Sequence, residues 1–572
     1  MRARGSCVVV VLCASTWACA QSLTFSNQTV AAGAAYTYET PIDSPDWWAA
    51  WMIAGGTIAD FNNDAWPDIY MLRGGLAPNV LLINNGDGTF TDQAPAWGMD
   101  HTHFSVGAAA GDFNNDGWID LYVTSHGITD ESQVGDHRLY RNNGDNTFTD
   151  IAEAAGVNKT TDSLADGFGA AFGDYDLDGD LDLCVVGWYV NEPNRNKLFR
   201  NNGDETFTDV TSEAIDYDLD KVSGFSPRFV DTNGDRYPEL LIAADFHTSQ
   251  YFVNNTDGTF TRRTVEAGVG LDSNGMGAAA ADFDNDGLID WYVTSIHHPD
   301  LPHIYSGNML YLNQGDDTFI EVSEERGVND GAWGWGTDAI DFDHDGWLDI
   351  VEVNSEFGAL PDEQEYLFIN QGDAHFQEQA LDAGFVLYCD ARAVGTLDYD
   401  NDGDRDIAVF SYDDGLYLFR NDLAGPGANW LEIALDTSLD HTLAPNGFGT
   451  RVECTAAGVQ RVRVLDAGAN YLGGSELTIH FGLGAAPIVD TLDILWNNGR
   501  TTTLQNVDVN QTITIHACPA DVNGDTILNI LDFVAYQSAF LNQDPTADCD
   551  ANAVFNILDF VCYQQLFQTG CP

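Results

Sequence analysis

Positive charge is scarce in this sequence. Its 572 residues include 22 lysine and arginine residues against 89 aspartate and glutamate residues, which gives a formal net charge of −67. Only three of the cations are lysines, at Lys159, Lys197 and Lys221. Such an excess of negative charge repels phosphate backbones and anionic lipid surfaces. The composition therefore predicts no nucleic-acid partner, and we expect many of the acids to hold cations.

Long hydrophobic runs are also missing, apart from one at the N-terminus. Residues 1–20 (MRARGSCVVVVLCASTWACA) combine two early arginines, an apolar run and an Ala-Cys-Ala cleavage pattern, as in a secretory signal peptide. Lipidation at Cys19 is an alternative interpretation of this segment. No later segment reaches the 18 or more apolar residues of a membrane-spanning helix. We predict a secreted protein, extracellular or cell-surface associated, with no transmembrane segment after signal removal.

Cysteine is rare between the two ends of the chain. Cys184, Cys389 and Cys454 are scattered, and we predict that they are buried thiols. A second group crowds into the last 55 residues, at Cys518, Cys549, Cys562 and Cys571. In an exported protein this density predicts two disulfide bonds, and the spacing leaves their connectivity open.

What the sequence does contain is an acidic motif of nine residues that recurs seven times. The copies are DFNNDAWPD from Asp60, DFNNDGWID from Asp112, DYDLDGDLD from Asp174, DTNGDRYPE from Asp231, DFDNDGLID from Asp282, DFDHDGWLD from Asp341 and DYDNDGDRD from Asp398. Short runs rich in Val, Tyr and Leu surround each copy and end at turn residues, which is typical of β-strands. Four such runs per repeat predict one blade of a β-propeller.

The two ends of the repeat array complement each other. The seventh repeat lacks the strand headed by Thr-Phe, while TFSNQTVAAG from Thr24 aligns with TFTDIAEAAG from Thr147. An N-terminal strand that completes the last blade would close the ring and remove its open sheet edges. We therefore predict a mainly β protein with a seven-bladed propeller over residues 21–425.

The spacing within the motif predicts calcium binding. Oxygen side chains at positions 1, 3, 5 and 9, with the backbone carbonyl of position 7, suit a hard cation that takes six to eight oxygen ligands. The predicted ligands are Asp60, Asn62, Asp64, Asp68; Asp112, Asn114, Asp116, Asp120; Asp174, Asp176, Asp178, Asp182; Asp231, Asn233, Asp235, Glu239; Asp282, Asp284, Asp286, Asp290; Asp341, Asp343, Asp345, Asp349; and Asp398, Asp400, Asp402, Asp406.

An alternative to metal binding is a set of Asx turns that need no ion. Five loops have glycine at position 6, where the chain must turn sharply. The first loop has Ala65 there, and the fourth has Arg236 and ends in Glu239, so we expect weak binding or none in these two. The seven repeats resemble the FG-GAP (VCBS) family, whose propeller is similar to the integrin α-subunit head. This resemblance implies about seven structural Ca²⁺ ions in the blades.

Residues 426–516 lose the acidic loops and contain alternating strand patterns. The segments NGFGTRVECTA, HFGLG and WNNGR resemble the ASPIC/UnbV domain that follows such propellers in relatives of cartilage acidic protein. We expect a small β domain here, and the resemblance adds architecture more than function.

Residues 517–572 contain two loops of 12 residues, each followed by an apolar helical pattern. The predicted ligands are Asp521, Asn523, Asp525, Asn529 and Asp532, then Asp548, Asp550, Asn552, Asn556 and Asp559. The pair resembles a dockerin module, which implies about two Ca²⁺ ions and docking onto a cohesin-like or cell-surface partner. Four cysteines and the bulky pairs Ile530-Leu531 and Ile557-Leu558 depart from that pattern. The alternative is that the module is a C-terminal cap of the protein, stabilised by calcium, that binds no partner.

Motifs of known catalytic sites are missing, including H-E-x-x-H, G-x-S-x-G and the Walker loop. Histidines between the predicted strands are expected to be surface loop residues, although they could converge on one face; they are His101, His103, His126, His297, His298 and His303. Our principal hypothesis is a secreted binding or adhesion protein whose propeller face binds protein or glycan. The alternative is a dockerin-borne, polysaccharide-processing enzyme, either a glycoside hydrolase or a lyase.

Overall fold

A computed structural model describes residues 22–39, 51–126, 136–160, 166–188, 195–302, 304–355, 364–425, 427–466, 468–543, 547, 549 and 554–569. The predicted signal peptide (1–20) lies outside these residues, as do Asp548, Asp550, Asn552, His303 and Cys571. Within the described ranges, no helix is long and apolar enough to cross a membrane.

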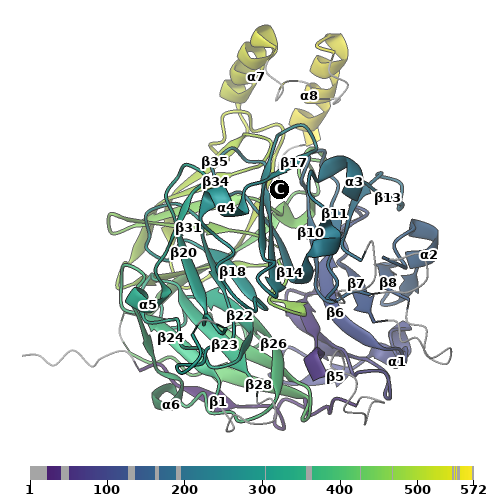
Figure 1. The fold of residues 1–572 in the computed structure, drawn as a ribbon. Helices are drawn as coiled ribbons and strands as arrows, with labels where there is room; N and C mark the ends of the chain where they lie inside the picture. The colour runs from purple at the N-terminus through teal and green to yellow at the C-terminus, as the bar shows by residue number, and fades with distance from the viewer. Residues whose placement is uncertain are drawn as a thin grey trace, which may run out of the picture.

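Antiparallel sheets of four strands recur along the first 421 residues (Figure 1). The described part of this region contains seven sheets, each with four antiparallel strands; the first gains a fifth strand from the second domain, and in six of the seven the four strands follow the chain order. They consist of β2 (Gly56–Ala59), β3 (Asp68–Met71), β4 (Val80–Asn84), β5 (Phe90–Asp92); β6 (Ser105–Gly111), β7 (Asp120–Ser125), β8 (Arg138–Asn142), β9 (Phe148–Asp150); β10 (Ala170–Gly173), β11 (Asp182–Val185), β12 (Lys197–Asn201), β13 (Phe207–Asp209); β14 (Ser223–Val230), β15 (Glu239–Asp245), β16 (Gln250–Asn254), β17 (Phe260–Arg262); β18 (Ala278–Ala281), β19 (Asp290–Val293), β20 (Met309–Asn313), β21 (Phe319–Glu321); and β22 (Gly334–Ile340), β23 (Asp349–Asn354), β24 (Tyr366–Asn370), β25 (Phe376–Glu378).

The remaining sheet joins the two ends of the array. It contains β26 (Ala391–Leu397), β27 (Asp406–Ser411), β28 (Leu416–Asn421) and the N-terminal strand β1 (Phe25–Asn27). β1 pairs antiparallel with β28, with Phe25 opposite Asn421. The predicted closing strand is therefore confirmed, and the repeated sheets are compatible with the predicted propeller.

A short helix follows the outer strand of six sheets. These helices have four residues each, and five of them end at a glycine with positive φ. The six are α1 (Ala94–Trp97), α2 (Ala152–Ala155), α3 (Thr211–Ala214), α4 (Thr264–Ala267), α5 (Ser323–Arg326) and α6 (Ala380–Ala383). A 3₁₀ turn, η2 (Leu219–Lys221), follows α3. The helix and turn therefore lead the chain from the outer strand of one sheet toward the next.

Neighbouring sheets pack face to face around a common centre. Apolar side chains fill the interfaces, as where Tyr122 of the second sheet packs with Phe172 and Leu183 of the third. The innermost strands contact one another in sequence, and β26 contacts β2. Arg228 of β14 donates from Nη2 to the carbonyl of Ala278 in β18 at 2.9 Å. The sheets thus form a ring whose inner strands surround an axial channel.

A small β domain follows the ring. Its two sheets have the orders β33-β29-β36 and β31-β30-β34-β35, and they enclose an apolar core. The elements are β29 (Asn429–Asp436), η3 (Pro445–Gly447), β30 (Arg451–Ala456), β31 (Val459–Val464), β33 (Ile479–Gly484), β34 (Ile488–Leu495), β35 (Thr501–Asp508) and β36 (Thr512–His516).

A segment of the small domain enters the axial channel. Within it, β32 (Gly473–Gly474) pairs in parallel with β2 of the first sheet. The Tyr471 side chain is fully buried, and its ring lies 5.2 Å from the rings of both Phe225 and Trp335. Its Oη donates to the carbonyl of Met52 at 2.8 Å. The channel is thus filled by a loop of the second domain.

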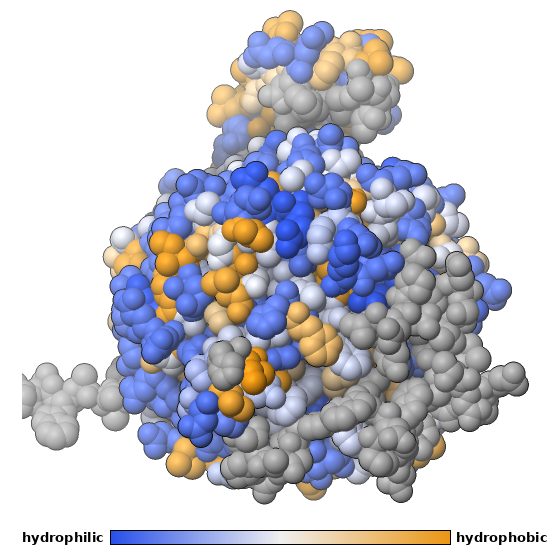
Figure 2. All heavy atoms as spheres, in the orientation of Figure 1, coloured by the Kyte–Doolittle hydropathy of each residue, from blue (hydrophilic) through white to orange (hydrophobic). Residues whose placement is uncertain are grey.

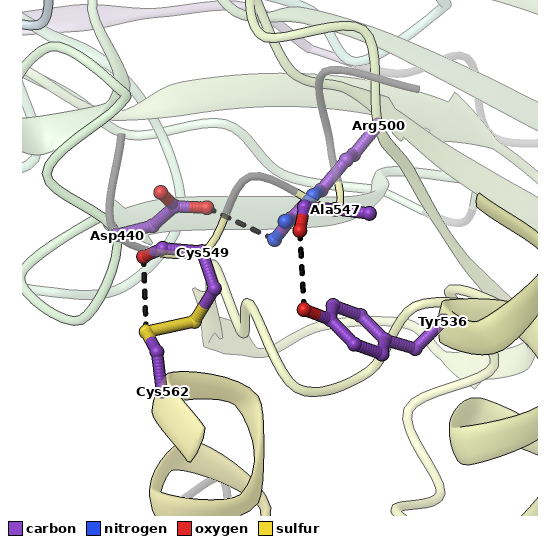
Figure 3. The surroundings of a disulfide bond; sticks show 6 residues. All are labelled: Asp440, Arg500, Tyr536, Ala547, Cys549 and Cys562. Atoms are coloured by element: carbon purple, nitrogen blue, oxygen red, sulfur yellow. Dashed lines mark hydrogen bonds and ion pairs between the residues drawn. A yellow bond between two sulfur atoms is a disulfide. The ribbon is translucent and has the colours of Figure 1, made fainter. Parts of the chain in front are cut away.

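Two helices, α7 (Ile530–Asn542) and α8 (Ile557–Thr569), project from one end of the molecule (Figure 1). The rings of Tyr536 and Tyr563 stack between them at 3.9 Å. Cys549 and Cys562 form a disulfide bond, with the hydrogen bond from Tyr536 to the carbonyl of Ala547 nearby (Figure 3).

The other cysteines fit the sequence expectation in part. Cys518 is also disulfide-bonded. Cys571 lies outside the described residues, so its predicted disulfide stays a prediction. The thiols of Cys184 and Cys454 are free and buried, as predicted. Cys389 is free but only half-buried.

Candidate metal centres

Each acidic loop connects the first and second strands of its sheet, so the seven loops lie at one end of the ring. Position 9 of the motif is the first residue of the second strand, as with Asp120 in β7. It is buried because the strand is packed on both faces. The predicted carboxylates therefore come together at the edge of a rigid sheet.

A shared hydrogen-bond pattern shapes the loops. In the second loop, the carboxylate of its first residue, Asp112, accepts the backbone N–H groups of Asp116 and Gly117 at 3.0 and 2.8 Å. The φ angle at position 6 is positive in every loop, including 67° at Ala65 and 81° at Arg236. The first and fourth loops therefore adopt the same turn without glycine, in a region that costs other residues strain.

Four loops bring three aspartates together. Their carboxylate oxygens at positions 1, 3 and 9 all lie within 4.8 Å of one another. The groups are Asp174, Asp176, Asp182; Asp282, Asp284, Asp290; Asp341, Asp343, Asp349; and Asp398, Asp400, Asp406. Each group could hold a metal ion.

Position 5 is not part of these groups. Its carboxylate instead accepts the backbone N–H of position 7, as when Asp345 accepts from Trp347 at 2.9 Å. The predicted ligand role of position 5 stays a prediction. Position 3 is asparagine in the first, second and fourth loops, so the side chain there supplies a neutral oxygen. Among the described residues, these three loops contain no group of three close carboxylates.

Electrostatics in these groups favour a bound cation. Burial, followed by repulsion from Asp178 and Asp176, raises the pKa of Asp174 well above its ordinary value. Burial and repulsion from Asp178 raise the pKa of Asp176 to about 6. The Oδ1 atoms of Asp176 and Asp400 are buried without a hydrogen-bond partner. A cation with oxygen ligands would satisfy these atoms and neutralise the repulsion, so the residues fit a metal.

The first C-terminal loop forms a fifth group. Carboxylate oxygens of Asp521, Asp525 and Asp532 lie within 4.8 Å of one another. Asp532 also belongs to a capping box with Asn529 at the start of α7. Asn556 and Asp559 cap α8 in the same way, with Asn556 N donating to Asp559 at 2.7 Å. Positions 9 and 12 thus also have a structural role as helix caps.

An asparagine that the sequence analysis passed over links neighbouring loops. Asn142 N donates to Asp120 Oδ1 at 2.7 Å, while its Nδ2 donates at 2.9 Å to the carbonyl of Phe61 in the preceding loop. The same pair of bonds recurs at the end of the third strand in every sheet, with the N–H bond long, at 3.5 Å, in the fourth. The signal was present in the sequence as Asn84, Asn142, Asn201, Asn254, Asn313, Asn370 and Asn421.

The small β domain lies directly on the loops. Arg451 donates from Nη2 to the carbonyl of Gly287 at 2.8 Å in the fifth loop, and Gly484 N donates to the carbonyl of His344 at 2.7 Å in the sixth. In the seventh, Asp398 N donates to Glu476 at 2.9 Å. The second, third and fourth loops also approach the domain, whereas the first is held by its neighbouring loops. The candidate metal groups and the small domain therefore share one face of the ring.

The histidines of the sequence analysis take part in separate local contacts. His126 is buried, contrary to the surface position expected, and lies 3.2 Å from Asp166, and His297 lies 2.7 Å from the exposed Asp330. The His101 ring packs at a tilt against Tyr140, with centroids 5.8 Å apart, and the His298 ring does so against Tyr305 at 6.1 Å. No histidine belongs to a candidate metal group within the described ranges.

Family profiles match both main parts of the chain. The profile of FG-GAP-like repeats matches residues 60–123, 174–242, 231–293 and 303–352, and that of ASPIC and UnbV matches residues 441–521. The chain therefore carries FG-GAP repeats followed by an ASPIC/UnbV domain. The dockerin resemblance of the C-terminal module stays a prediction.

Among curated proteins, the chain is weakly similar to cartilage acidic protein 1. It is 24% identical to the Xenopus tropicalis protein over 414 residues, 67% of this chain and 54% of that protein. It is 27% identical to the Homo sapiens protein over 262 residues, 44% of this chain and 37% of that protein. The chain thus matches about half or less of these relatives' length. A solved structure, the BP39L lectin from Burkholderia pseudomallei, has a TM-score of 0.41 at 10% identity, covering 66% of this chain and 98% of that chain.

Proposed function

We propose that this chain is a secreted, calcium-binding β-propeller protein that binds a protein or glycan ligand in adhesion. The observation that carries the calcium assignment is the set of four aspartate triads with oxygens within 4.8 Å. Their ligands are all oxygen, with no cysteine or histidine, which favours Ca²⁺ over Zn²⁺ or copper. Similarity to cartilage acidic protein 1 supports an adhesion or binding role.

Secretion is supported by the chemistry of the C-terminal region. A disulfide joins Cys549 and Cys562, and Cys518 is disulfide-bonded as well. Disulfides form and persist mainly in oxidising compartments. They agree with the signal-like sequence of residues 1–20.

The two C-terminal helices are proposed to attach the protein to a partner. Ile530, Leu531 and Val534 of α7 are 68%, 57% and 54% exposed, and the corresponding residues of α8 are also exposed. Hydrophobic surface covers much of both helices at their tips (Figure 2). The one acid in each helix, Asp532 or Asp559, is buried. A cohesin-like partner with a neutral, apolar surface fits this face better than a charged one.

The metal assignment is tested by calcium binding and thermal unfolding of the full chain. Equilibrium dialysis with ⁴⁵Ca²⁺ should give about four to nine ions per chain, and magnesium at equal concentration should not replace them. Each site that binds only the folded state adds about 2.7 kcal/mol at a hundredfold excess over Kd. EDTA should therefore lower the Tm strongly. An unchanged Tm after chelation would overturn the assignment.

The ligand class requires a separate screen. The purified protein, with calcium and with EDTA, is tested against glycan arrays and polysaccharide hydrolase and lyase substrates. Calcium-dependent binding without turnover supports the proposal. Turnover of a polysaccharide would instead establish the alternative, an extracellular polysaccharide-processing enzyme.

A further inference from the structure

The turn between β15 and β16 has a strained backbone. It spans residues 245–248 and is closed by a hydrogen bond from Thr248 N to the carbonyl of Asp245 at 3.1 Å. Its two central residues, Phe246 and His247, have φ angles of 57° and 59°. Turns with positive φ at both central positions favour glycine, asparagine and aspartate, because a bulky side chain is strained there. The chain thus accepts strain to place a phenylalanine and a histidine in this turn.

The strained turn holds an aromatic ring at the protein surface. Phe246 is 50% exposed, and His247 is exposed as well. The Phe246 ring packs at a tilt against the half-buried Trp188, with centroids 6.0 Å apart. Trp188 stacks on Phe225 of β14, whose ring contacts that of Tyr471 in the channel. The exposed ring therefore rests on a rigid aromatic support near the channel axis.

Polar groups lie beside the aromatic rings. Asp245 accepts hydrogen bonds from Trp188 Nε1 at 2.8 Å and from Asn274 Nδ2 at 2.7 Å. Asn274 is half-buried, and its Oδ1 atom accepts no hydrogen bond from a described residue. His247 N donates to the carbonyl of Ser273 at 3.1 Å, which brings the exposed histidine close to this amide. The carboxylate therefore orients an amide whose carbonyl oxygen is available to a ligand.

This surface lies away from the acidic loops. The fourth acidic loop joins β14 to β15, whereas the turn follows β15 at the opposite end of that strand. The small domain contacts the loop end, as where Arg236 donates to the carbonyl of Asn497 at 3.0 Å. The turn is therefore separate from the candidate metal groups.

We call these residues the turn patch, and its composition favours a neutral ligand. The patch consists of Trp188, Asp245, Phe246, His247 and Asn274. It contains one carboxylate and no lysine or arginine, in a chain of net charge −67, so it repels anions. A stable protein interface takes about 20–30 residues on each side, many more than the patch supplies.

A sugar ring matches the patch in size and chemistry. One face of a pyranose presents C–H groups, which are attracted to the electron-rich face of an aromatic ring. Its hydroxyl groups both donate and accept hydrogen bonds, so they suit an amide oxygen and an imidazole nitrogen. The patch offers both kinds of contact side by side.

We propose that the turn patch binds a neutral pyranose unit of a glycan. Phe246 is the stacking platform, and Asn274 and His247 bond to the hydroxyl groups. This inference rests on the proposed function, because it selects glycan over protein as the ligand class and assigns the site. The strained turn holds Phe246 in the exposed position that stacking requires.

An oligosaccharide array tests the ligand class with the full chain in calcium. The array carries neutral oligosaccharides of glucose, xylose, mannose and galactose, together with uronic-acid and sulfated ones. We expect binding to neutral members alone, and isothermal titration with the best of them gives the Kd. Absence of binding to every neutral member would overturn this inference. The calcium assignment and a protein ligand have separate tests, so the proposed function would not fail with it.

Variants separate an aromatic platform from a merely apolar one. Phe246→Leu keeps an apolar side chain and the same backbone strain, but should weaken binding about tenfold, the size of one aromatic contact. Phe246→Trp should retain binding. The control is Ile320→Ala, because Ile320 is 53% exposed on the outer strand β21. Equal affinity of wild type and Phe246→Leu would show that the glycan binds elsewhere, which leaves the proposed function intact.

Hydrogen exchange of the wild type covers the case in which a variant does not fold. The bound oligosaccharide should slow exchange in residues 245–248 and 272–274 and leave β21 unchanged. Slowed exchange in other segments alone would refute the site. A protein partner that protects residues 245–248, without any glycan binding, would refute the ligand class while supporting the proposed function.

Discussion

The asparagine at the end of each third strand joins features that are far apart in the sequence. Asn142 is buried, and its amide reaches the carbonyls of both Phe61 and Ile119. Its backbone N–H holds Asp120, the carboxylate at position 9. One residue type therefore positions a candidate metal ligand and connects two sheets.

Asn142→Ala should destabilise the ring without changing its fold. The substitution leaves the two buried carbonyls without a donor, which costs roughly 2 kcal/mol. Urea unfolding followed by tryptophan fluorescence measures the change. Asn143→Ala is the matched control, since Asn143 is exposed and bonds only to nearby threonines. A loss of equal size in both variants would contradict the bridging role.

Glu352 breaks the apolar pattern of the second strands. The equivalent residues of the other sheets are all apolar, namely Met71, Val123, Val185, Ile242, Val293 and Val409. Glu352 is fully buried, and its Oε2 accepts hydrogen bonds from Tyr292 and Asn308 at 2.7 Å each. Burial raises its pKa from 4.5 to about 8, against the lowering effect of these bonds.

The raised pKa predicts a pH-dependent stability. The folded chain holds the proton more tightly than the unfolded chain, so the contribution is full below pH 4.5 and is lost as pH rises through about 8. Relative to Glu352→Gln, the wild type should lose up to about 1.4 kcal/mol per pH unit between these limits. Unfolding at several pH values measures this slope. Glu325→Gln, at an exposed site, should leave it unchanged.

At the scale of elements, the segment that carries β32 decides how the two domains fit together. Its backbone bonds to several sheets: Ala108 N donates to the carbonyl of Leu472, and Thr337 N donates to that of Asn470. Gly473 passes so close to β2 that a Cβ atom would lie 1.9 Å from the carbonyl oxygen of Gly56. Only glycine leaves room for this approach.

Gly473→Ala should therefore displace β32 from the channel. We expect a lower Tm and faster limited proteolysis between the ring and the small domain. Gly474→Ala is the control, because its Cβ would lie 3.3 Å from Thr57 Oγ1, a side chain that can adjust. Proteolysis of Gly473→Ala at the wild-type rate would contradict this prediction, because it would show that the segment can shift without leaving the channel.

For the whole molecule, the acidic loops that contain the candidate metal groups also contact the small domain. The sixth loop contacts the small domain through His344, whose ring lies 4.9 Å from that of His480. The first loop is hydrogen-bonded to the second and seventh loops, with Asn63 donating to the carbonyl of Gly117 and Asn401 donating to that of Ala65. Loss of a ligand should therefore have different effects in the two loops.

Hydrogen exchange of the calcium-loaded protein measures this difference. Asp343→Ala should speed exchange several-fold in β33, which packs on the sixth loop, as well as in β22 and β23. Asn62→Ala, at the same motif position in the first loop, should affect β2 and β3 alone. Exchange in β33 that responds equally to both variants would show that the loops do not transmit metal loss to the small domain.

The sequence by itself determined the repeated strands, the acidic loops and the closing strand at Phe25. These features depend on local alternation and on fixed spacing within each repeat, which survive in a linear sequence. The FG-GAP and ASPIC/UnbV resemblances rested on the same local patterns. Spacing alone did not show that Asp345, at position 5 of the motif, accepts the backbone N–H of Trp347, and its ligand role stays a prediction.

Only the tertiary structure decided how the parts meet. The entry of Tyr471 into the channel and the contacts of the small domain with six loops join residues up to several hundred positions apart. Such contacts depend on closure of the ring and on glycines that let two backbones approach closely. No local sequence pattern predicts the closure or the approach. Local sequence patterns thus specify the strands and the acidic loops, while tertiary packing determines which domains and sheets they bring into contact.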